Sequence, residues 1–178
     1  CNSYSSLPVH TLCFKKDAFA KLRLELTSKN EDSILISVGE MKQKNTLSID
    51  SIPGRNIRYH KAYLKLKPGT HWYEIPWPSN PKRAKNRFMI KMPEYIGEVY
   101  PFRYLNIKGY SNDLKTNQVI RTVVNYTFEE NASSFDSSDE ILNQVWDFCK
   151  YSMKATSFCG YYVDGDRERI PYEADAFI

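Results

Sequence analysis

Short runs of alternating apolar and polar residues follow one another between about residues 14 and 128. A period of two places one side of an extended strand in a core and the other side in water. The runs cover residues 20–26, 34–38, 63–66, 72–75, 87–92, 103–107 and 119–126. Polar turns, several with proline or glycine, separate them. This pattern predicts a mainly β fold in which residues 14–128 form an antiparallel β-sandwich domain.

The hydrophobic period changes after residue 136. Apolar side chains then recur at helical spacing, and they are Ile141, Leu142, Val145, Cys149 and Met153. The stripe predicts an amphipathic helix over roughly residues 139–158, with residues 129–136 as a linker. Ser137 and Glu140 have capping-box spacing, and Gly160 is a natural stop. This pattern fits equally a helix that caps the sandwich and the first helix of an α-helical domain.

Composition and charge narrow the class of protein. Of 178 residues, 42% are hydrophobic and 14% aromatic, which is enough for a packed core and excludes a disordered chain. The net charge of +4 is small, and the densest basic run, residues 82–87, is interpreted as a solvated loop. We therefore predict no nucleic-acid partner. The four cysteines and three histidines lack zinc-site spacing, which predicts no metal or cofactor.

The chain begins with Cys1, followed by the polar residues 2–6. Such a start resembles a bacterial lipoprotein after signal removal, with a lipid anchor on the Cys1 thiol. In that interpretation residues 1–13 are a tether and the protein passes through the secretory pathway to the periplasm or cell surface. The alternative is that the sequence simply starts at a cysteine.

Carboxylates and guanidinium groups concentrate near the C-terminus, within the segment DGDRERIPYEAD, residues 164–175. Gly165 and Pro171 mark this segment as a loop. Glycosidic bond cleavage needs two carboxyl groups, and sugar sites add further carboxylates, arginines and aromatic rings. On chemistry alone the segment is either an exposed ion-pair loop or part of a sugar-cleaving site.

The same segment resembles the start of the catalytic domain of bacterial α-L-rhamnosidases, glycoside hydrolase family 78, in its Bacteroidetes form. In that family an (α/α)6-barrel, or six-hairpin, domain opens with a helix and a loop of the form Asp-x-Pro-x-Arg-Glu-(x)3-Trp-x-x-Asp. Arg167-Glu168, with Asp175 seven positions after Glu168, fits the second half of that motif.

The resemblance implies a role for each matching residue. Glu168 stands in the place of the general acid, and Arg167 in that of the motif arginine. Asp175 and Asp164 stand in the places of carboxylates that bind rhamnose hydroxyls. Asp164 lies one position closer to Glu168 than is common, so either Asp164 or Asp166 fills that place. Tyr172 replaces the usual tryptophan as an aromatic wall.

The resemblance also implies an inverting mechanism, with a general base on a later barrel loop. Residues 137–178 would then be the incomplete start of the barrel domain in a truncated chain that is inactive alone. Its partners would be the remainder of the catalytic domain and a rhamnose-containing oligosaccharide or glycoside. We therefore expect an exposed apolar helix face, made of Ile141, Leu142, Val145 and Trp146.

Two other functions fit the pattern. The sandwich could be a non-catalytic carbohydrate-binding module, with Trp72, Tyr73 and Trp77 stacking on sugar rings, although one of Trp72 and Tyr73 must face inward. It could also be a structural or interaction domain of a surface lipoprotein.

Overall fold

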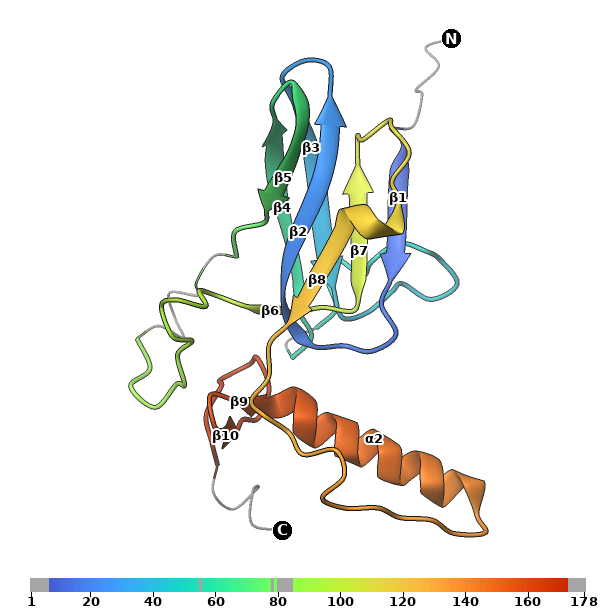
Figure 1. Ribbon diagram of the computed structural model, residues 1–178, viewed down its shortest axis with the longest axis vertical. Helices are drawn as coiled ribbons and strands as arrows, with labels where there is room; N and C mark the ends of the chain where they lie inside the picture. The colour runs from blue at the N-terminus through green and yellow to red at the C-terminus, as the bar shows by residue number, and fades with distance from the viewer. Residues whose placement is uncertain (1–6, 55, 78, 80–84, 173–178) are drawn as a thin grey trace. The chain divides into compact units, whose positions relative to one another are not determined.

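The computed structural model describes residues 7–54, 56–77, 79 and 85–172 (Figure 1). Within this part the chain is mainly β, with antiparallel sheets and one α-helix. It divides into two compact units. The sandwich unit comprises Cys1–Trp77 and Val99–Val123, and the C-terminal unit comprises Pro78–Glu98 and Val124–Ile178.

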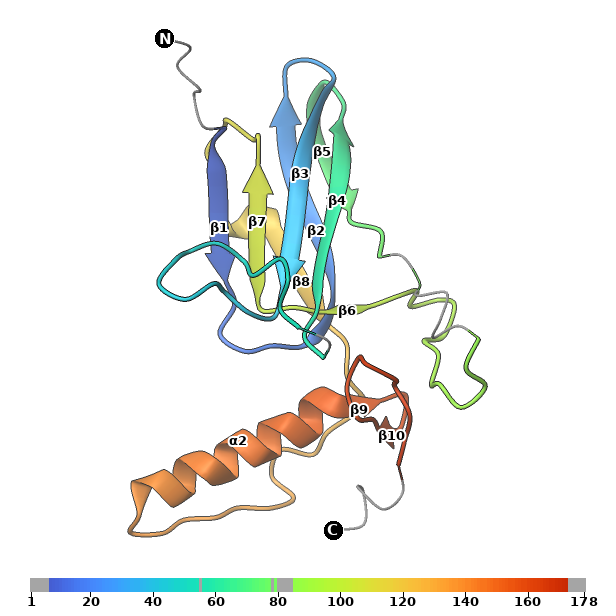
Figure 2. The same ribbon diagram turned by 180° about the vertical axis from the view of Figure 1, so that it is seen from behind.

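Two four-stranded sheets form the sandwich unit. One has the order β1-β7-β3-β4, and in the other β5, β6 and β8 all pair with the central strand β2. The strands are β1 (Val9–Cys13), β2 (Phe19–Ser28), β3 (Asp32–Gly39), β4 (Tyr59–Leu66), β5 (Gly69–Glu74), β6 (Tyr100–Pro101), β7 (Tyr104–Lys108) and β8 (Val119–Val123), with a short 3-10 helix, η1 (Thr116–Gln118), before β8. Figure 2 shows the β1-β7-β3-β4 sheet from the front.

Alternate residues of the facing strands form one apolar core. On β2 they are Ala20, Leu22, Leu24 and Leu26, all fully buried. From the other sheet come Ile34, Ile36 and Val38 of β3 and Leu105 and Ile107 of β7. These are positions that the period-two pattern assigned to an inner face, so the antiparallel sandwich is confirmed as the fold of this unit.

The three aromatic residues considered for sugar stacking differ in burial. Trp77 is 7% exposed, and its Nε1 donates a hydrogen bond to the carbonyl oxygen of Ala20 at 3.0 Å. Tyr73 packs against the core, whereas Trp72 is 41% exposed with the Arg23 guanidinium 5.1 Å from its ring centre. Trp77 is therefore a core residue and is not available for stacking on a sugar.

Two strand predictions were wrong. Residues 9–13, assigned to a tether, form edge strand β1, which pairs with β7 along its whole length. Leu12 of this strand packs against the core, although polar residues precede it in the sequence. The alternating run 87–92 forms no strand, because it belongs to the C-terminal unit and has no strand beside it. Phe88 in this run is 60% exposed.

The α-helix of the C-terminal unit is α2 (Glu140–Thr156), as its period predicted. Its N-cap is Asp139, whose carboxylate accepts a hydrogen bond from the Ile141 amide at 2.8 Å. The predicted capping box is wrong, because Ser137 instead hydrogen-bonds Asn143. Gly160 does not end the helix either, since it lies in the turn between β9 (Ser157–Phe158) and β10 (Tyr161–Tyr162).

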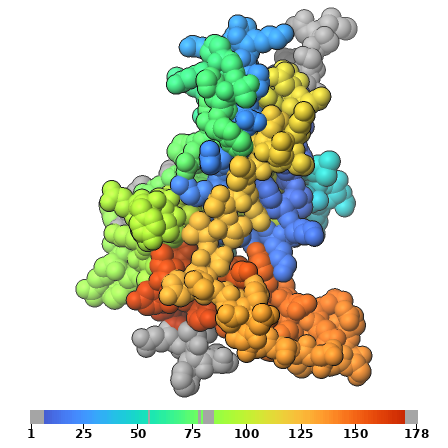
Figure 3. Space-filling view, viewed as in Figure 1, coloured from blue at the N-terminus to red at the C-terminus, as the bar shows by residue number. Residues whose placement is uncertain are grey.

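No residue of α2 is buried, and atoms of this part of the chain, coloured orange, lie at the surface in Figure 3. The expected exposure of the apolar face is confirmed for Ile141, Leu142 and Val145, which are 70%, 49% and 51% exposed. Trp146 is partly buried and stacks on Phe135, with ring centres 5.5 Å apart. In the described part of the chain, no helix has the length and apolarity needed to cross a membrane.

Candidate active site

The predicted site residues lie in a loop that follows the β9–β10 hairpin, and we call residues 163–172 the carboxylate loop. The two turn residues of the hairpin, Cys159 and Gly160, both have positive φ, at 52° and 88°. That geometry belongs to a tight hairpin turn, which here reverses the chain directly after α2. The amide of Val163 then donates to the carbonyl of Thr156 at 3.1 Å, which anchors the loop to the helix end.

Hydrogen bonds within the carboxylate loop close it on itself. The Asp164 amide donates to the Ile170 carbonyl, and the Ile170 amide donates to Asp164 Oδ1, both at 3.3 Å. Between them the Arg169 amide donates to the Gly165 carbonyl at 3.2 Å. Gly165 has a φ of 108°, which glycine adopts readily and other residues do not. Residues 164–170 therefore form a compact turn in which Asp166 and Arg169 are buried, whereas Arg167 and Glu168 between them are accessible to solvent.

One side of this turn carries the group that contains Glu168. The Arg167 Nη2 lies 3.4 Å from Asp164 Oδ2 and 3.4 Å from Glu168 Oε2, so one guanidinium group lies between two carboxylates. The Tyr172 hydroxyl donates to Glu168 Oε2. The side chains of Arg167 and Glu168 are 51% and 36% exposed. Solvent can therefore reach Arg167 and Glu168.

The hydrogen bond to Glu168 also affects Tyr172. Because its phenol donates to a carboxylate and lies near the negative charges of Glu168 and Asp164, the pKa of Tyr172 is raised above its ordinary value. The phenol is therefore protonated at neutral pH and acts as a donor to Glu168.

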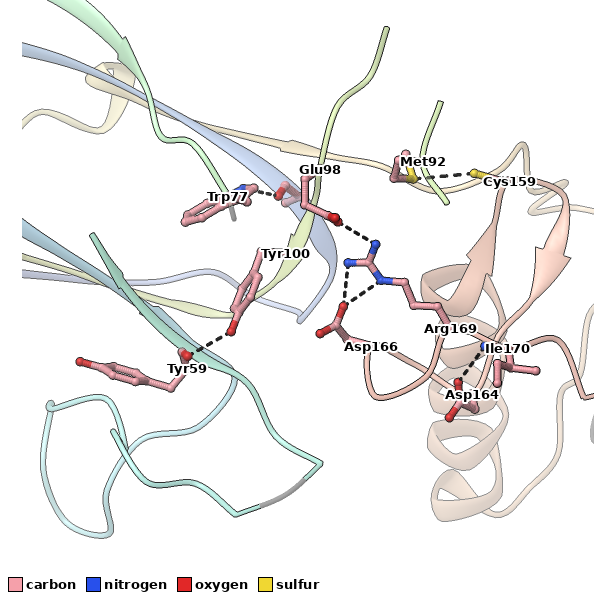
Figure 4. Close-up of polar contacts among 11 residues, drawn as sticks. Tyr59, Trp77, Met92, Glu98, Tyr100, Cys159, Asp164, Asp166, Arg169 and Ile170 are labelled. Carbon is pink, nitrogen blue, oxygen red and sulfur yellow. Dashed lines mark hydrogen bonds and ion pairs between the residues drawn. The ribbon is translucent and has the colours of Figure 1, made fainter. Parts of the chain in front are cut away.

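The other side of the turn holds a buried ion cluster, shown in Figure 4. Arg169 is fully buried, and its Nε and Nη2 donate to Asp166 Oδ1 at 2.9 and 2.7 Å. Its Nη1 donates to Glu98 Oε1 at 2.7 Å. The guanidinium also lies 5.1 Å from the centre of the Phe158 ring. We call Arg169, Asp166, Glu98 and Phe158 the arginine clamp.

The structure thus brings together Asp164, Arg167, Glu168 and Tyr172 and separates Asp166 from them. Asp166 is 7% exposed and holds Arg169, whereas Asp164 lies beside Arg167. Asp175 lies outside the described residues, as do Cys1 and residues 82–84 of the basic run 82–87. The roles assigned to all these residues stay predictions.

Sequence reasoning gave no role to Arg169 or Glu98. Arg169 was visible in the charged segment, but nothing in the sequence distinguishes a buried arginine from its exposed neighbour Arg167. Glu98 lies 71 positions before Arg169, in a stretch without any recognisable motif. Only the fold brings these two residues together.

Among the described residues there is no group of three or more histidine, cysteine, aspartate or glutamate side chains arranged to hold a metal ion. The chemistry that the exposed group offers is that of a carboxyl group, a guanidinium and a phenol. These can transfer a proton and hydrogen-bond the hydroxyls of a sugar.

A comparison with protein families bears on this group. Residues 130–178 match the model of the bacterial alpha-L-rhamnosidase 6 hairpin glycosidase domain. The match includes α2, the hairpin and the carboxylate loop, and it leaves the sandwich unit outside. No curated protein and no solved structure matches the chain. The C-terminal segment is therefore similar to a rhamnosidase-type glycoside hydrolase domain, and we call residues 130–178 the rhamnosidase-like segment.

Proposed function

We propose that the protein belongs to an inverting glycoside hydrolase that removes terminal α-L-rhamnose from glycosides or plant polysaccharides. The observation that carries this proposal is the position of Glu168. It lies in the rhamnosidase-like segment, solvent-accessible, with Arg167 and Tyr172 bonded to one of its carboxyl oxygens. The finer assignment, to glycoside hydrolase family 78 and its Bacteroidetes form, rests on the DGDRERIPYEAD motif.

In this mechanism Glu168 is the general acid, which protonates the leaving glycosidic oxygen. Tyr172 and Arg167 orient the Glu168 carboxyl group, and Asp164 accepts hydrogen bonds from rhamnose hydroxyls, with Asp175 as its proposed partner. The general base would come from a later barrel loop. Inverting enzymes hold the two carboxyl groups about 6.5–9.5 Å apart, so that a water molecule fits between the base and the sugar.

Asp164 is the better candidate than Asp166 for binding the sugar. Asp164 Oδ2 lies next to the exposed Arg167, on the same side of the turn as Glu168. Asp166 Oδ1 already accepts two hydrogen bonds from a buried guanidinium. Turning Asp166 toward a substrate would break two hydrogen bonds of a buried cation, which is costly.

The test is hydrolysis of two aryl α-L-rhamnosides by the complete gene product, as wild type and as Glu168→Gln. One substrate carries a phenol that leaves only when protonated, and the other a dinitrophenol that leaves as the anion. Loss of a general acid lowers the rate by about 10²- to 10⁴-fold. We expect a loss in that range for the phenyl substrate and a much smaller loss for the dinitrophenyl substrate.

Glu130→Gln is the matched control, because it makes the same carboxylate-to-amide change in the same unit. Glu130 pairs with Lys154 and its side chain is 54% exposed. Equal activity of wild type and Glu168→Gln on the phenyl substrate would show that the acid is another residue. Absence of hydrolysis by the wild type on both rhamnosides would reject this substrate class.

The lipid anchor at Cys1 and the location in the periplasm or at the cell surface stay proposals. Mass analysis of the N-terminal peptide from membrane fractions of the native cell would test both, because a diacylglyceryl group on the Cys1 thiol has a defined mass.

A further inference from the structure

We infer that the arginine clamp positions the general acid: Arg169, fixed by Asp166 and Glu98, sets the orientation of the neighbouring Glu168. Arg169 and Glu98 are positioning residues in this proposal and touch no substrate. The inference rests on the proposed function for the identity of the acid. The clamp itself rests only on the contacts of the C-terminal unit.

The first argument is that each nitrogen of the buried Arg169 guanidinium group donates a hydrogen bond. A guanidinium group stays charged at all accessible pH values, and a charge without exposure to water needs partners. All three nitrogens of Arg169 donate to carboxylate oxygens, two to Asp166 and one to Glu98, at 2.7–2.9 Å. These three hydrogen bonds to two carboxylates fix the plane of the guanidinium.

The second argument is the backbone of Arg169. Its φ is 54°, in the left-handed region, which a residue with a side chain occupies only where its surroundings hold it there. The Arg169 amide donates to Gly165, and its carbonyl accepts from the Ile90 amide at 2.9 Å. Side chain and backbone of this residue are thus fixed from three directions.

The third argument is the position of Glu168 directly before Arg169. Asp166 and Arg169 face inward, and Arg167 and Glu168 between them face the solvent. Any rotation of the Arg169 backbone moves the Glu168 carboxyl group. A displacement of about 1 Å at a reacting group can lower the rate by about 10²-fold, so the clamp has direct catalytic consequences.

The outer partner of the clamp comes from a remote part of the sequence. Glu98 and Ile90 belong to Pro78–Glu98, which packs into the C-terminal unit although it precedes α2 by more than forty residues. The Cys159 thiol also contacts this segment, at the Lys91 carbonyl and the Met92 sulfur. The rhamnosidase-like segment therefore does not hold its acid loop alone.

Glu98→Gln is the most informative variant for a test in the complete gene product. It keeps an oxygen acceptor of the same shape, removes one charge, and leaves Asp166 to pair with Arg169, so we expect the variant to fold. We expect kcat on the phenyl rhamnoside to fall about 10- to 100-fold, because the acid is misplaced by up to about 1 Å. KM should change much less, and so should kcat on the dinitrophenyl rhamnoside. Glu130→Gln should match wild type throughout.

A double-mutant cycle decides between positioning and general destabilisation. If Glu98 acts through Glu168, Glu98→Gln has no further effect on kcat in a Glu168→Gln background. Equal losses in both backgrounds, or equal losses on both leaving groups, would overturn the inference. An unchanged kcat of Glu98→Gln on the phenyl substrate would overturn it as well.

Amide hydrogen exchange separates this inference from the proposed function. We expect faster exchange at Arg169 and Ile90 in Glu98→Gln, and unchanged exchange there in Glu130→Gln. Unchanged exchange in both variants would disprove the clamp, whatever the activity. A wild-type protein without activity would refute the proposed function and the catalytic role of the clamp, and faster exchange would then show that Glu98 still holds the loop.

Discussion

The interiors of the sandwich unit and the C-terminal unit are made of different side chains. In the sandwich unit, fully buried leucine, isoleucine and valine residues from two sheets meet in one core. In the C-terminal unit, α2 contributes no buried residue, and the largest fully buried side chains among the described residues are Arg169 and Phe158. One unit is organised by apolar area and the other by an ion cluster.

This difference separates stability from positioning. Apolar burial is roughly proportional to area and has little directionality, so it stabilises a fold without fixing individual side chains. Charged hydrogen bonds are directional, and a bidentate arginine fixes both orientation and distance. The sandwich unit therefore resembles a scaffold, and the C-terminal unit is built to hold the Glu168 loop in one geometry while its apolar helix face stays exposed.

The largest expected effect comes from removing the buried cation. Arg169→Met should destabilise the C-terminal unit by about 3–5 kcal/mol, because Asp166 and Glu98 lose the buried cation to which they are hydrogen-bonded. Leu24→Ala in the sandwich core should cost about 2–5 kcal/mol through lost burial and a cavity. Amide exchange at Tyr126 and Arg169 reports on the C-terminal unit, and exchange at Ile75 reports on the sandwich unit.

The two variants serve as controls for each other. If Arg169→Met accelerates exchange at Ile75 as strongly as at Tyr126, the two units unfold together. Their different interiors would then not give them separate stabilities. Acceleration confined to the unit that carries the substitution would establish that the contrast is energetic.

A smaller effect is expected from the cap of α2. Because this helix buries no residue, local interactions such as the Asp139 cap should matter more than they would for a buried helix. Asp139→Ala should destabilise the C-terminal unit by about 1 kcal/mol, measured by urea unfolding followed through helical circular dichroism. Ser137→Ala is a suitable comparison, because Ser137 does not cap the helix. A larger loss in Ser137→Ala would reverse that assignment.

The smallest expected effect concerns pH and the sandwich unit. Burial lowers the pKa of His60 below its ordinary value near 6.5, so the unfolded chain binds this proton more readily than the folded one. Stability should therefore be complete above about pH 6.5 and fall as the pH drops toward the folded pKa of His60. Urea midpoints at about pH 7.5 and about pH 5.5 measure this slope. The slope should be weaker in His60→Gln, and an equal slope in both proteins would refute it.

Sequence periodicity by itself determined the strands of the sandwich core and the helix α2. Residues 20–26 alternate strictly, residues 34–38 carry Ile34, Ile36 and Val38 at a period of two, and residues 141–153 repeat at helical spacing, because one face of each element is apolar. The charged motif also marked the loop with Asp164, Arg167 and Glu168. These signals are local, since they depend on neighbours within one strand, one helix or one loop.

Only the tertiary structure decided which charged residues face inward. Asp166 and Arg169 look like Asp164 and Arg167 in the sequence, yet Asp166 and Arg169 are buried, whereas the Arg167 side chain is 51% exposed and pairs with Asp164 at the surface of the turn. Strand formation also depended on the tertiary structure in two places. Strand β1 forms because it pairs with β7, whereas residues 87–92 alternate in sequence but form no strand. A buried charge needs a partner, and for Arg169 that partner includes Glu98, 71 positions away. No local pattern encodes such a pairing, because it exists only after the chain has folded.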